Sequence, residues 1–491
     1  MGLGLLSFEP VPAQAASGSA SLLKDIDPGA EGSLPMGFTA FNGRLYFVAA
    51  EINAGPELWA TDGTSAGTVL VKDIYPGSYG SNPSGFTVFN GKLYFSADDG
   101  GGRELWATDG TAAGTTLIKD INPGSSGSDP HALTVFNGKL YFAANDGVTG
   151  TELWATDGTA AGTALVKDIY PGSSGSNLNS FTVFNGRLYF DATDGVTGDI
   201  GQGVLGTELW VTDGTTAGTG LVKDINPGLS GSAPAELTAF NGKLYFRAKN
   251  SATGYELWAT DGTAAGTALV KDIKPGTSSS LPDGFMVFNG KLYFSADDGV
   301  TGDELWSTDG TEIGTALVKD LHPSTNAPNS FIGIFSVFNG KLYFPVDNGT
   351  TGYELWVSDG TTSGTSLVKT ISSSTIAYPG SFTTFNDMLY FVTVSDSKGI
   401  NLWATDGTAA GTTLVKTINS GVSDFYPSGF TKFNDKTYFS ADNGKSGAEL
   451  WVLSASTDEG SSGGGAFEML TLLGLLFGMW LRRRHTLQLS T

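Results

Sequence analysis

Residues 57–72 read ELWATDGTSAGTVLVK, and the chain repeats this phrase along its whole length. The tryptophan recurs at spacings of 47 to 56 residues, at positions 59, 106, 154, 210, 258, 306, 356, 403 and 451. A second phrase, FNGKLYF or a variant, precedes each tryptophan, and LVKDI or a variant also occurs nine times. Such a fixed period is typical of repeat architectures, in which each copy is one supersecondary unit.

Each copy divides into four short strands, as the second copy illustrates. Strands are predicted at 85–89, 92–97, 104–108 and 116–121. Asn90 and Gly91 between the first two strands are the strongest two-residue hairpin signal, because a type I′ turn needs positive φ at both positions. Adjacent large residues in KLYF and ELW point to opposite faces of a sheet, so both faces must be covered. Blades packed around an axis achieve this, and the sequence therefore predicts an all-β propeller of four-stranded blades.

The two ends of the repeat region predict a closed ring of nine blades rather than a linear β-solenoid, which is the alternative. The region begins with a lone fourth strand, LLKDI at 22–26, and its last copy stops after the third strand, at 449–453. We expect the two segments to pair and complete one blade. Residues 22–453 are therefore assigned to the propeller, 1–21 to a signal-peptide remnant or disordered start, 454–465 to a linker and 466–491 to a C-terminal tail.

The third and fourth strands of a copy should form a hairpin across the DGT turn. If Thr61 pairs with Thr68, Glu57 faces Lys72, and the same arithmetic holds in most copies. We therefore expect a recurring cross-strand ion pair between the Glu of ELW and the Lys of LVKDI, which would fix the strand register.

The phrase ELWATDGTAAGT resembles the ELWxxDGTxxGT repeat of bacterial surface and secreted proteins. The match covers about nine tenths of the chain. The resemblance implies extracellular, propeller-like repeats and no known reaction. The late copies depart from it: Asn401 replaces the usual Glu, Asp387 and Asp435 replace the turn glycine, and copy nine has no DGT.

The C-terminal tail carries a short apolar run, 469–481, that ends in Arg482, Arg483 and Arg484. Its 13 residues are fewer than the roughly 20 that a spanning helix needs. The arginines place that end in the cytoplasm by the positive-inside rule. Glycines, a short apolar helix and terminal arginines resemble the glycine-glycine (rhombosortase-type) sorting signals of Gram-negative bacteria, which implies cleavage near Gly463, Gly464 and Gly465. The alternative is a plain transmembrane anchor.

The N-terminus contains Ala13-Gln14-Ala15, which fits the pattern before a signal cleavage site at Ala15. No Lys or Arg precedes it, so we expect the true start to lie upstream; the alternative is a disordered terminus. Together the two ends predict a protein secreted or displayed at the surface of a Gram-negative bacterium, held in the inner membrane by its tail before processing.

Composition limits the partners and the chemistry. The net charge of −22 disfavours nucleic acid and anionic lipid. The absence of cysteine removes thiolate chemistry and disulfides. Among three histidines, His131 and His322 fall in loops and His485 in the tail. The sequence thus offers no catalytic residue and requires no cofactor.

Acidic residues offer two candidate cation sites. One Asp heads each complete DGT turn, and we expect it to cap backbone N–H groups; the alternative is a ring of cation ligands. These residues are Asp62, Asp109, Asp157, Asp213, Asp261, Asp309, Asp359 and Asp406. The loops between the second and third strands pair Asp or Asn with glycine and could bind calcium or serve as plain turns. The candidate ligands there are Asp98, Asp99, Asp297, Asp298 and Asp303.

Two function classes remain. The first is a non-enzymatic propeller for adhesion or binding of a glycan, matrix or protein ligand. The second is an extracellular hydrolase or lyase with a site at the propeller mouth, which would need unmatched His, Glu, Asp or Arg on one face. The insertion 199–206 is the clearest departure from the repeat and holds one acidic residue and no base. This favours binding, on the face formed by the loops after the fourth strand and between the second and third.

Overall fold

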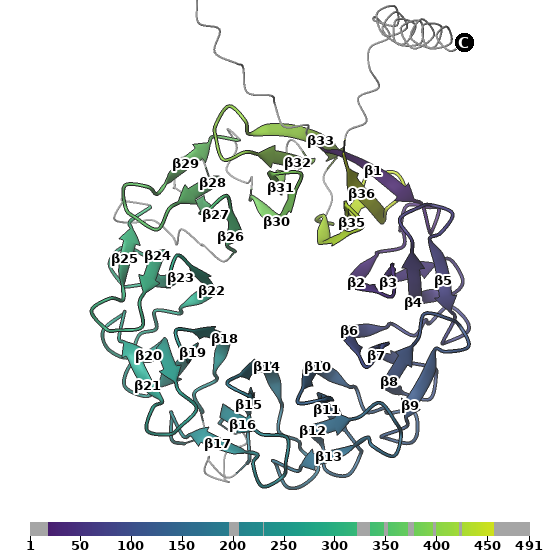
Figure 1. Cartoon of the computed structure of the whole chain (residues 1–491), viewed down its shortest axis with the longest axis horizontal. Coiled ribbons are helices and arrows are strands. Elements are labelled where there is room, and N and C mark those ends of the chain that lie inside the picture. Colours follow the sequence, from purple (N-terminus) through teal and green to yellow (C-terminus); the bar gives the residue numbers. More distant parts are fainter. Residues whose placement is uncertain are drawn as a thin grey trace, which may run out of the picture. The chain divides into compact units, whose positions relative to one another are not determined.

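The propeller is described in a computed structural model that covers residues 18–195, 206–228, 230–321, 334–347, 352–371, 378–395, 399–421 and 425–455. These residues form nine four-stranded antiparallel sheets arranged as blades of one ring, as Figure 1 shows. The predicted all-β propeller with nine blades is therefore confirmed, and the solenoid alternative is excluded. The expected cleavage sites, the apolar C-terminal helix and the arginine cluster lie outside the described residues.

The first two strands of each blade lie nearest the axis of the ring (Figure 1). The first strands are β2 (Met36–Phe41), β6 (Ser84–Phe89), β10 (His131–Phe136), β14 (Asn179–Phe184), β18 (Ala235–Phe240), β22 (Asp283–Phe288), β26 (Ser336–Phe338), β30 (Gly380–Phe385) and β34 (Ser428–Phe433). The second strands are β3 (Arg44–Glu51), β7 (Lys92–Asp98), β11 (Lys139–Asn145), β15 (Arg187–Ala192), β19 (Lys243–Asn250), β23 (Lys291–Asp297), β27 (Lys341–Asp347), β31 (Met388–Ser395) and β35 (Lys436–Asp442).

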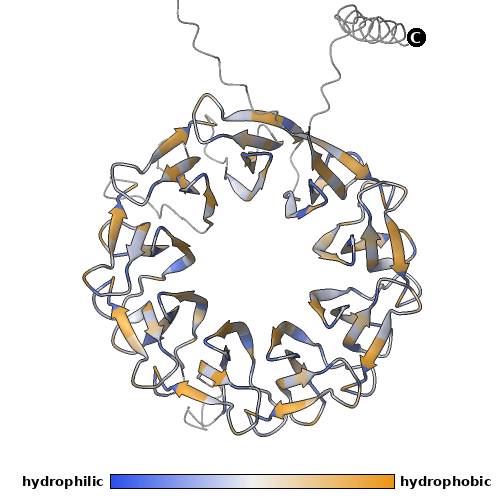
Figure 2. Ribbon diagram, viewed as in Figure 1, coloured by the Kyte–Doolittle hydropathy of each residue, from blue (hydrophilic) through white to orange (hydrophobic). Residues whose placement is uncertain are grey.

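The third and fourth strands contain the ELW and LVK phrases and lie farther from the axis of the ring. The third strands are β4 (Gly55–Thr61), β8 (Arg103–Thr108), β12 (Thr151–Thr156), β16 (Glu208–Thr212), β20 (Gly254–Thr260), β24 (Asp303–Thr308), β28 (Tyr353–Ser358), β32 (Gly399–Thr405) and β36 (Ala448–Ser454). The fourth strands are β5 (Val69–Lys72), β9 (Thr116–Lys119), β13 (Ala164–Lys167), β17 (Gly220–Lys223), β21 (Ala268–Lys271), β25 (Ala316–Lys319), β29 (Ser366–Lys369), β33 (Thr413–Asn419) and, for blade nine, β1 (Ser19–Lys24). Figure 2 shows the apolar residues of these outer strands.

The ring closes through its N-terminal strand, as predicted. Strand β1 pairs antiparallel with β36, from Ser19 opposite Ser454 to Lys24 opposite Leu450. The closing strand thus starts three residues before the predicted segment. Because the two strands come from opposite ends of the repeat region, blade nine exists only when both ends meet.

Tight turns join the strands within each blade. Asn90 and Gly91 have φ of 45° and 71°, as a type I′ turn requires. In blades eight and nine, Asp387 and Asp435 take the glycine position with φ of 56° and 55°, so aspartate tolerates the same left-handed conformation there. The departures noticed in the sequence therefore leave the turn unchanged.

The hydrophobic core lies between blades, in nine successive seams. In the seam between blades one and two, Tyr46, Leu58 and Ile74 pack against Phe95 and Trp106. Trp106 is 6% exposed, six of its equivalents are likewise buried, and Trp356 and Trp403 are partly buried in their seams. The tryptophans are thus core residues, as expected of large side chains at recurring mid-strand positions.

Each seam is also closed by a tyrosine and a glycine from neighbouring blades. The hydroxyl of Tyr46 in blade one lies where a Cβ on Gly110, the DGT glycine of blade two, would be placed, and Gly110 has φ of 101°. Only glycine meets both demands. Blade nine has no DGT, and the backbone N–H of Gly18 instead donates to the hydroxyl of Tyr390, with 2.6 Å between the two atoms. The N-terminal segment therefore supplies both the missing strand and the missing glycine.

Lysines of the fourth strands reach across the same seams. Lys72 Nζ donates to the carbonyl oxygen of Thr115 in blade two at 2.7 Å and lies 5.6 Å from the centre of the Trp106 ring. Lys24, Lys119, Lys167 and Lys319 repeat both contacts in other seams. A hydrogen bond and a cation–π contact of this kind contribute about 1 kcal/mol each.

The predicted ion pair between Glu57 and Lys72 is therefore wrong. The hairpin begins in the expected register, with Ala60 opposite Val69 and Trp59 opposite Leu70, but the next pair is Leu58 and Lys72. A β-bulge at Val71 shifts the register by one residue, and a bulge re-aims the side chains that follow it. Lys72 consequently points to the neighbouring blade.

Candidate functional site

The glutamates of ELW are buried, and their carboxylates accept hydrogen bonds from backbone N–H groups. Glu57 is fully buried, and its carboxylate accepts hydrogen bonds from the backbone of Ile74, Tyr75 and Ser81 at 2.7–3.1 Å and from the Ser81 hydroxyl at 2.5 Å. Burial raises the pKa of Glu57, and these hydrogen bonds oppose the rise. The glutamate thus anchors the loop that leaves the fourth strand, which is a structural role.

The aspartates of DGT are turn caps, as expected. Oδ1 of Asp62 accepts hydrogen bonds from the Thr64 backbone at 2.9 Å and from the Thr64 hydroxyl at 2.7 Å, which lower the pKa of Asp62. A Cβ on Gly67 would lie 2.1 Å from the Asp62 carboxylate, so the second glycine of DGTxxGT makes room for this cap. Thr61 and Thr68 join their hydroxyls at 2.7 Å beneath it. Every fixed letter of the phrase therefore has a structural contact.

The candidate calcium ligands hold their own loops. Oδ1 of Asp98 accepts from the backbone of Gly100 at 2.7 Å, and Oδ1 of Asp298 accepts from Thr301 at 2.7 Å. Asp99 accepts from the Gly101 backbone, and Asp297 forms an ion pair with Lys274. Within the described ranges, no three His, Asp or Glu side chains gather in a group able to hold a metal ion. Calcium binding by these loops stays a prediction.

The histidines add nothing to a site in the described part of the chain. His131 is exposed and is the first residue of β10, not a loop residue as the sequence predicted; its Nδ1 lies 2.9 Å from the carbonyl oxygen of Asp129 in the preceding loop. His322 and His485 lie outside the described residues.

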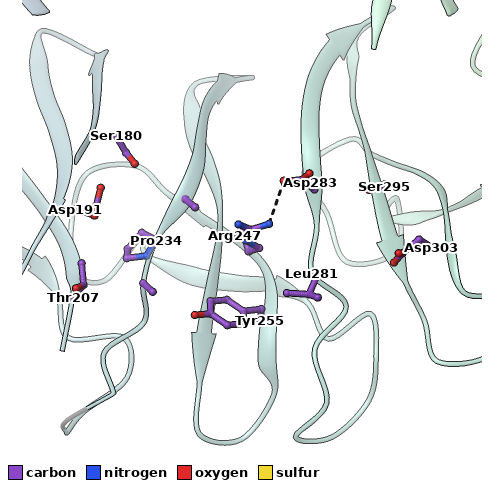
Figure 3. A pocket seen from close by; sticks show the side chains of 12 residues that line it. Ser180, Asp191, Thr207, Pro234, Arg247, Tyr255, Leu281, Asp283, Ser295 and Asp303 are labelled. Carbon is purple, nitrogen blue, oxygen red and sulfur yellow. Dashed lines mark hydrogen bonds and ion pairs between the residues drawn. The ribbon is translucent and has the colours of Figure 1, made fainter. Parts of the chain in front are cut away.

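One cavity of about 760 Å³, lined by both polar and apolar residues, opens over blades four, five and six. Its walls come from the starts of the first and third strands, from the second strands and from the loops that precede β18 and β22. These segments share one face of the ring, the face on which the sequence predicted binding. Figure 3 shows Asp191, Arg247, Tyr255, Asp283 and Asp303 around this cavity.

Asp191 is the most unusual residue of the cavity. It is 9% exposed, and its Oδ1 has no hydrogen-bond partner among the described residues. Burial raises the pKa of Asp191 to about 6, although the nearby Ser180 hydroxyl opposes the rise. A buried carboxylate without full pairing is costly. Because this oxygen serves no contact of the fold, Asp191 marks a candidate site for chemistry or binding.

Arg247 and Asp303 complete the charged lining. Arg247 Nη1 lies 3.2 Å from Oδ1 of Asp283, which neutralises both groups in an ion pair between blades five and six. Burial raises the pKa of Asp303, and the negative charge of Asp297 raises it further. The cavity therefore holds three carboxylates and one guanidinium, with two carboxylates left outside the ion pair.

Ser180 and Glu236 have φ of 57° and 62° at the second residue of their first strands. Blades one, two, six and nine have glycine with positive φ at this position, and Ala132 and Ser381 adopt the same left-handed conformation in blades three and eight. The conformation is therefore a feature of the repeat and does not mark the cavity.

A second cavity, of about 730 Å³, is lined by residues of blades nine, one, two, three and four. It is lined by the recurring Gly-Phe-Thr segments of the first strands, such as Phe38, Phe86 and Phe430. Because these residues repeat from blade to blade and pack on the second strands, this cavity follows from the repeat itself.

The sequence holds a signal for this cavity at one position of the repeat, which lies outside the recurring motifs. The residue after LYF in each copy is Val48, Ser96, Ala143, Asp191, Arg247, Ser295, Pro345, Val392 or Ser440. Only blades four and five carry a charge at this position. A comparison of the copies position by position would have isolated Asp191 and Arg247, whereas the insertion 199–206 marked only their neighbourhood.

Comparison with known proteins assigns the chain to no family. No protein-family model matches the chain, and the search of curated proteins found no similar sequence. Solved structures that align with it include a prolyl endopeptidase (TM-score 0.42, 11% identity, 73% of this chain and 54% of that chain). Others are a puromycin hydrolase (TM-score 0.36, 12% identity, 73% and 58%) and oligopeptidase B from Leishmania major (TM-score 0.40, 11% identity, 73% and 53%). The aligned region spans little more than half of each of those chains.

The described residues contain no helix long and apolar enough to cross a membrane.

Proposed function

We propose that this protein is a secreted or surface-displayed binding propeller that holds its ligand in the cavity over blades four to six. One observation carries the proposal. Among nine similar copies, whose recurring residues make structural contacts, the cavity is where a variable position of the repeat becomes charged, as Asp191 and Arg247. A cavity of this size, with a few convergent polar groups, suits a small ligand or one unit of a larger one.

The ligand class follows from the lining. Ser180, Thr207 and Ser295 offer hydroxyls, Tyr255 offers an aromatic ring with a polar tip, and the carboxylates accept hydrogen bonds. Hydroxyl-rich saccharides match this set better than apolar molecules do. The proposed ligand is therefore a glycan of the cell's surroundings.

A glycan array probed with the full chain tests this function, followed by calorimetry on each hit. Arg247→Ala should weaken the binding of a neutral glycan about tenfold or more, because it removes the guanidinium N–H groups that can donate hydrogen bonds to sugar oxygens. Ser440→Ala is the matched control, since it alters the equivalent position of blade nine, where the hydroxyl has no partner among the described residues. The proposal fails if no glycan binds, or if both variants change binding equally.

A second candidate is a hydrolase or lyase at the same cavity. The raised pKa values of Asp191 and Asp303 favour it, because carboxyls tuned toward neutrality can serve as general acids. An array hit should then be incubated with the protein and examined for shortened products. Loss of product in Asp191→Asn with retained binding would replace the binding proposal by the enzymatic one.

The route to the cell surface is a separate part of the proposal. The tail resembles a sorting signal, so mature protein from the native host should end near Gly463–Gly465. Intact mass spectrometry measures this directly. A mature chain that retains Arg482 would contradict the sorting signal and favour the alternative, a plain membrane anchor.

A further inference from the structure

We propose that the glycan bound by the cavity over blades four to six carries a free amine, and that the protonated amine binds at Asp191. The inference rests on the proposed function and narrows its ligand class to cationic saccharides. The proposed function names a glycan but not its charge, and this inference assigns the ligand a positive charge that pairs with Asp191.

The charge balance of the lining is the first observation. Arg247 and Asp283 neutralise each other at 3.2 Å, so the cavity retains the charges of Asp191 and Asp303 without an equal number of cations. The chain as a whole carries a net charge of −22, which attracts cations toward any open face. An anionic saccharide would meet repulsion from both sources.

The state of Asp191 is the second observation. The side chain is nine-tenths buried at the wall of the cavity, and Oδ1 lacks a partner among the described residues. An ammonium group has three donors and no acceptor, so it can satisfy such a carboxylate. A neutral hydroxyl would leave the desolvated charge unbalanced. A cationic ligand in the cavity would therefore offset the charge of Asp191 at its wall.

The remaining lining distinguishes a saccharide from a basic peptide. Ser180 and Thr207 flank Asp191 with small hydroxyls, and Tyr255 lies across the cavity. These groups suit a ring that bears several hydroxyls around its amine. A lysine side chain would present only methylenes to them.

The test compares saccharides that differ only in the amine. The full chain is titrated calorimetrically with a glucosamine tetramer, its N-acetylated counterpart and tetralysine. We expect the glucosamine tetramer to bind about 30-fold or more tightly than the acetylated form, since a buried charge pair is worth this much. Asp191→Asn should remove most of that difference, whereas Asp435→Asn, an equal charge change in a turn on the opposite face, should leave it intact.

The outcomes separate this inference from the proposed function. If the acetylated tetramer binds as tightly and Arg247→Ala weakens it, the cavity binds glycans but the amine inference is overturned. Tetralysine binding as tightly as the glucosamine tetramer would overturn the saccharide class. If neither saccharide binds and the array is also empty, both proposals fall. A circular dichroism spectrum equal to that of the wild type shows that each variant is folded.

Discussion

Replacing Glu449 by alanine should open the ring at its closing blade. The Glu449 carboxylate is fully buried and accepts hydrogen bonds from the Ile26 backbone at 2.9 Å and the Asp27 backbone at 3.1 Å. It also accepts from the Ser33 backbone at 2.9 Å and the Ser33 hydroxyl at 2.6 Å. The same four-bond pattern holds Glu57 inside blade one, but here the donors lie more than 400 residues away in sequence.

The magnitude follows from the donors that are left behind. Ile26 and Ser33 are buried, and each unsatisfied donor costs about 1–3 kcal/mol, while removing the desolvated carboxylate returns part of this. Breaking such a buried charged network typically costs about 3–5 kcal/mol. The local unfolding free energy of residues 19–33 should fall by that amount, which accelerates their amide exchange by about 100-fold or more.

Hydrogen–deuterium exchange followed by mass spectrometry measures the effect, and Glu104→Ala is the matched control. Glu104 has equivalent partners in Ile121, Asn122 and Ser128, but both sides of that loop belong to one continuous blade. We expect its exchange to rise only around 119–128. The reasoning is refuted if Glu449→Ala leaves exchange at 19–33 near the wild-type rate, or if Glu104→Ala accelerates it equally.

Three further changes test other contacts. Asp191→Asn should raise the free energy of unfolding by about 2–3 kcal/mol near pH 8. The carboxyl, whose pKa in the folded protein is raised to about 6, favours the fold only when it is protonated at low pH and loses this contribution as pH rises. Denaturant titrations should therefore show the gain disappearing toward about pH 4, and a difference that does not depend on pH would contradict the prediction. Gly110→Ala should cost about 2 kcal/mol or more, since it places a Cβ against the Tyr46 hydroxyl and strains a backbone at φ of 101°; a thermal midpoint within error of wild type would be inconsistent with this. Lys72→Met keeps the aliphatic stem but removes the charge over Trp106, so denaturant unfolding should show a loss of about 1–2 kcal/mol, and an unchanged midpoint would assign the lysine no role in the seam.

The fold was predictable because the same local information is written nine times. Asn90-Gly91 dictates its hairpin through φ alone, and the incomplete last copy predicts closure through chain connectivity. The bulge at Val71 was not predictable from strand pairing, because the alternation of residues in LVK is the same whether or not one residue is bulged. Its effect was to send Lys72 across the seam and leave Glu57 free to bind a loop.

The candidate site was less accessible from the sequence because repetition hid it. Asp191 occupies a position that elsewhere holds Val48, Ser96 or Ala143, so it looks like ordinary variation until burial is known. Burial and the missing partner of its Oδ1 within the described chain are three-dimensional facts, set by blades that no local pattern places side by side.

The seam contacts also bear on how the size of the ring can change. Because Tyr46 meets Gly110 and Lys72 meets Trp106, the residues that join two units are present in every complete copy. Recombination that deletes or duplicates one whole copy therefore restores every junction, and the terminal segment with Gly18 still fits the last one. Eight units would require about 45° between neighbours, against about 40° for the nine present, a change that small side-chain shifts can absorb. A cavity that spans three successive units would widen or narrow with that angle, so copy number alone could alter which ligands it admits.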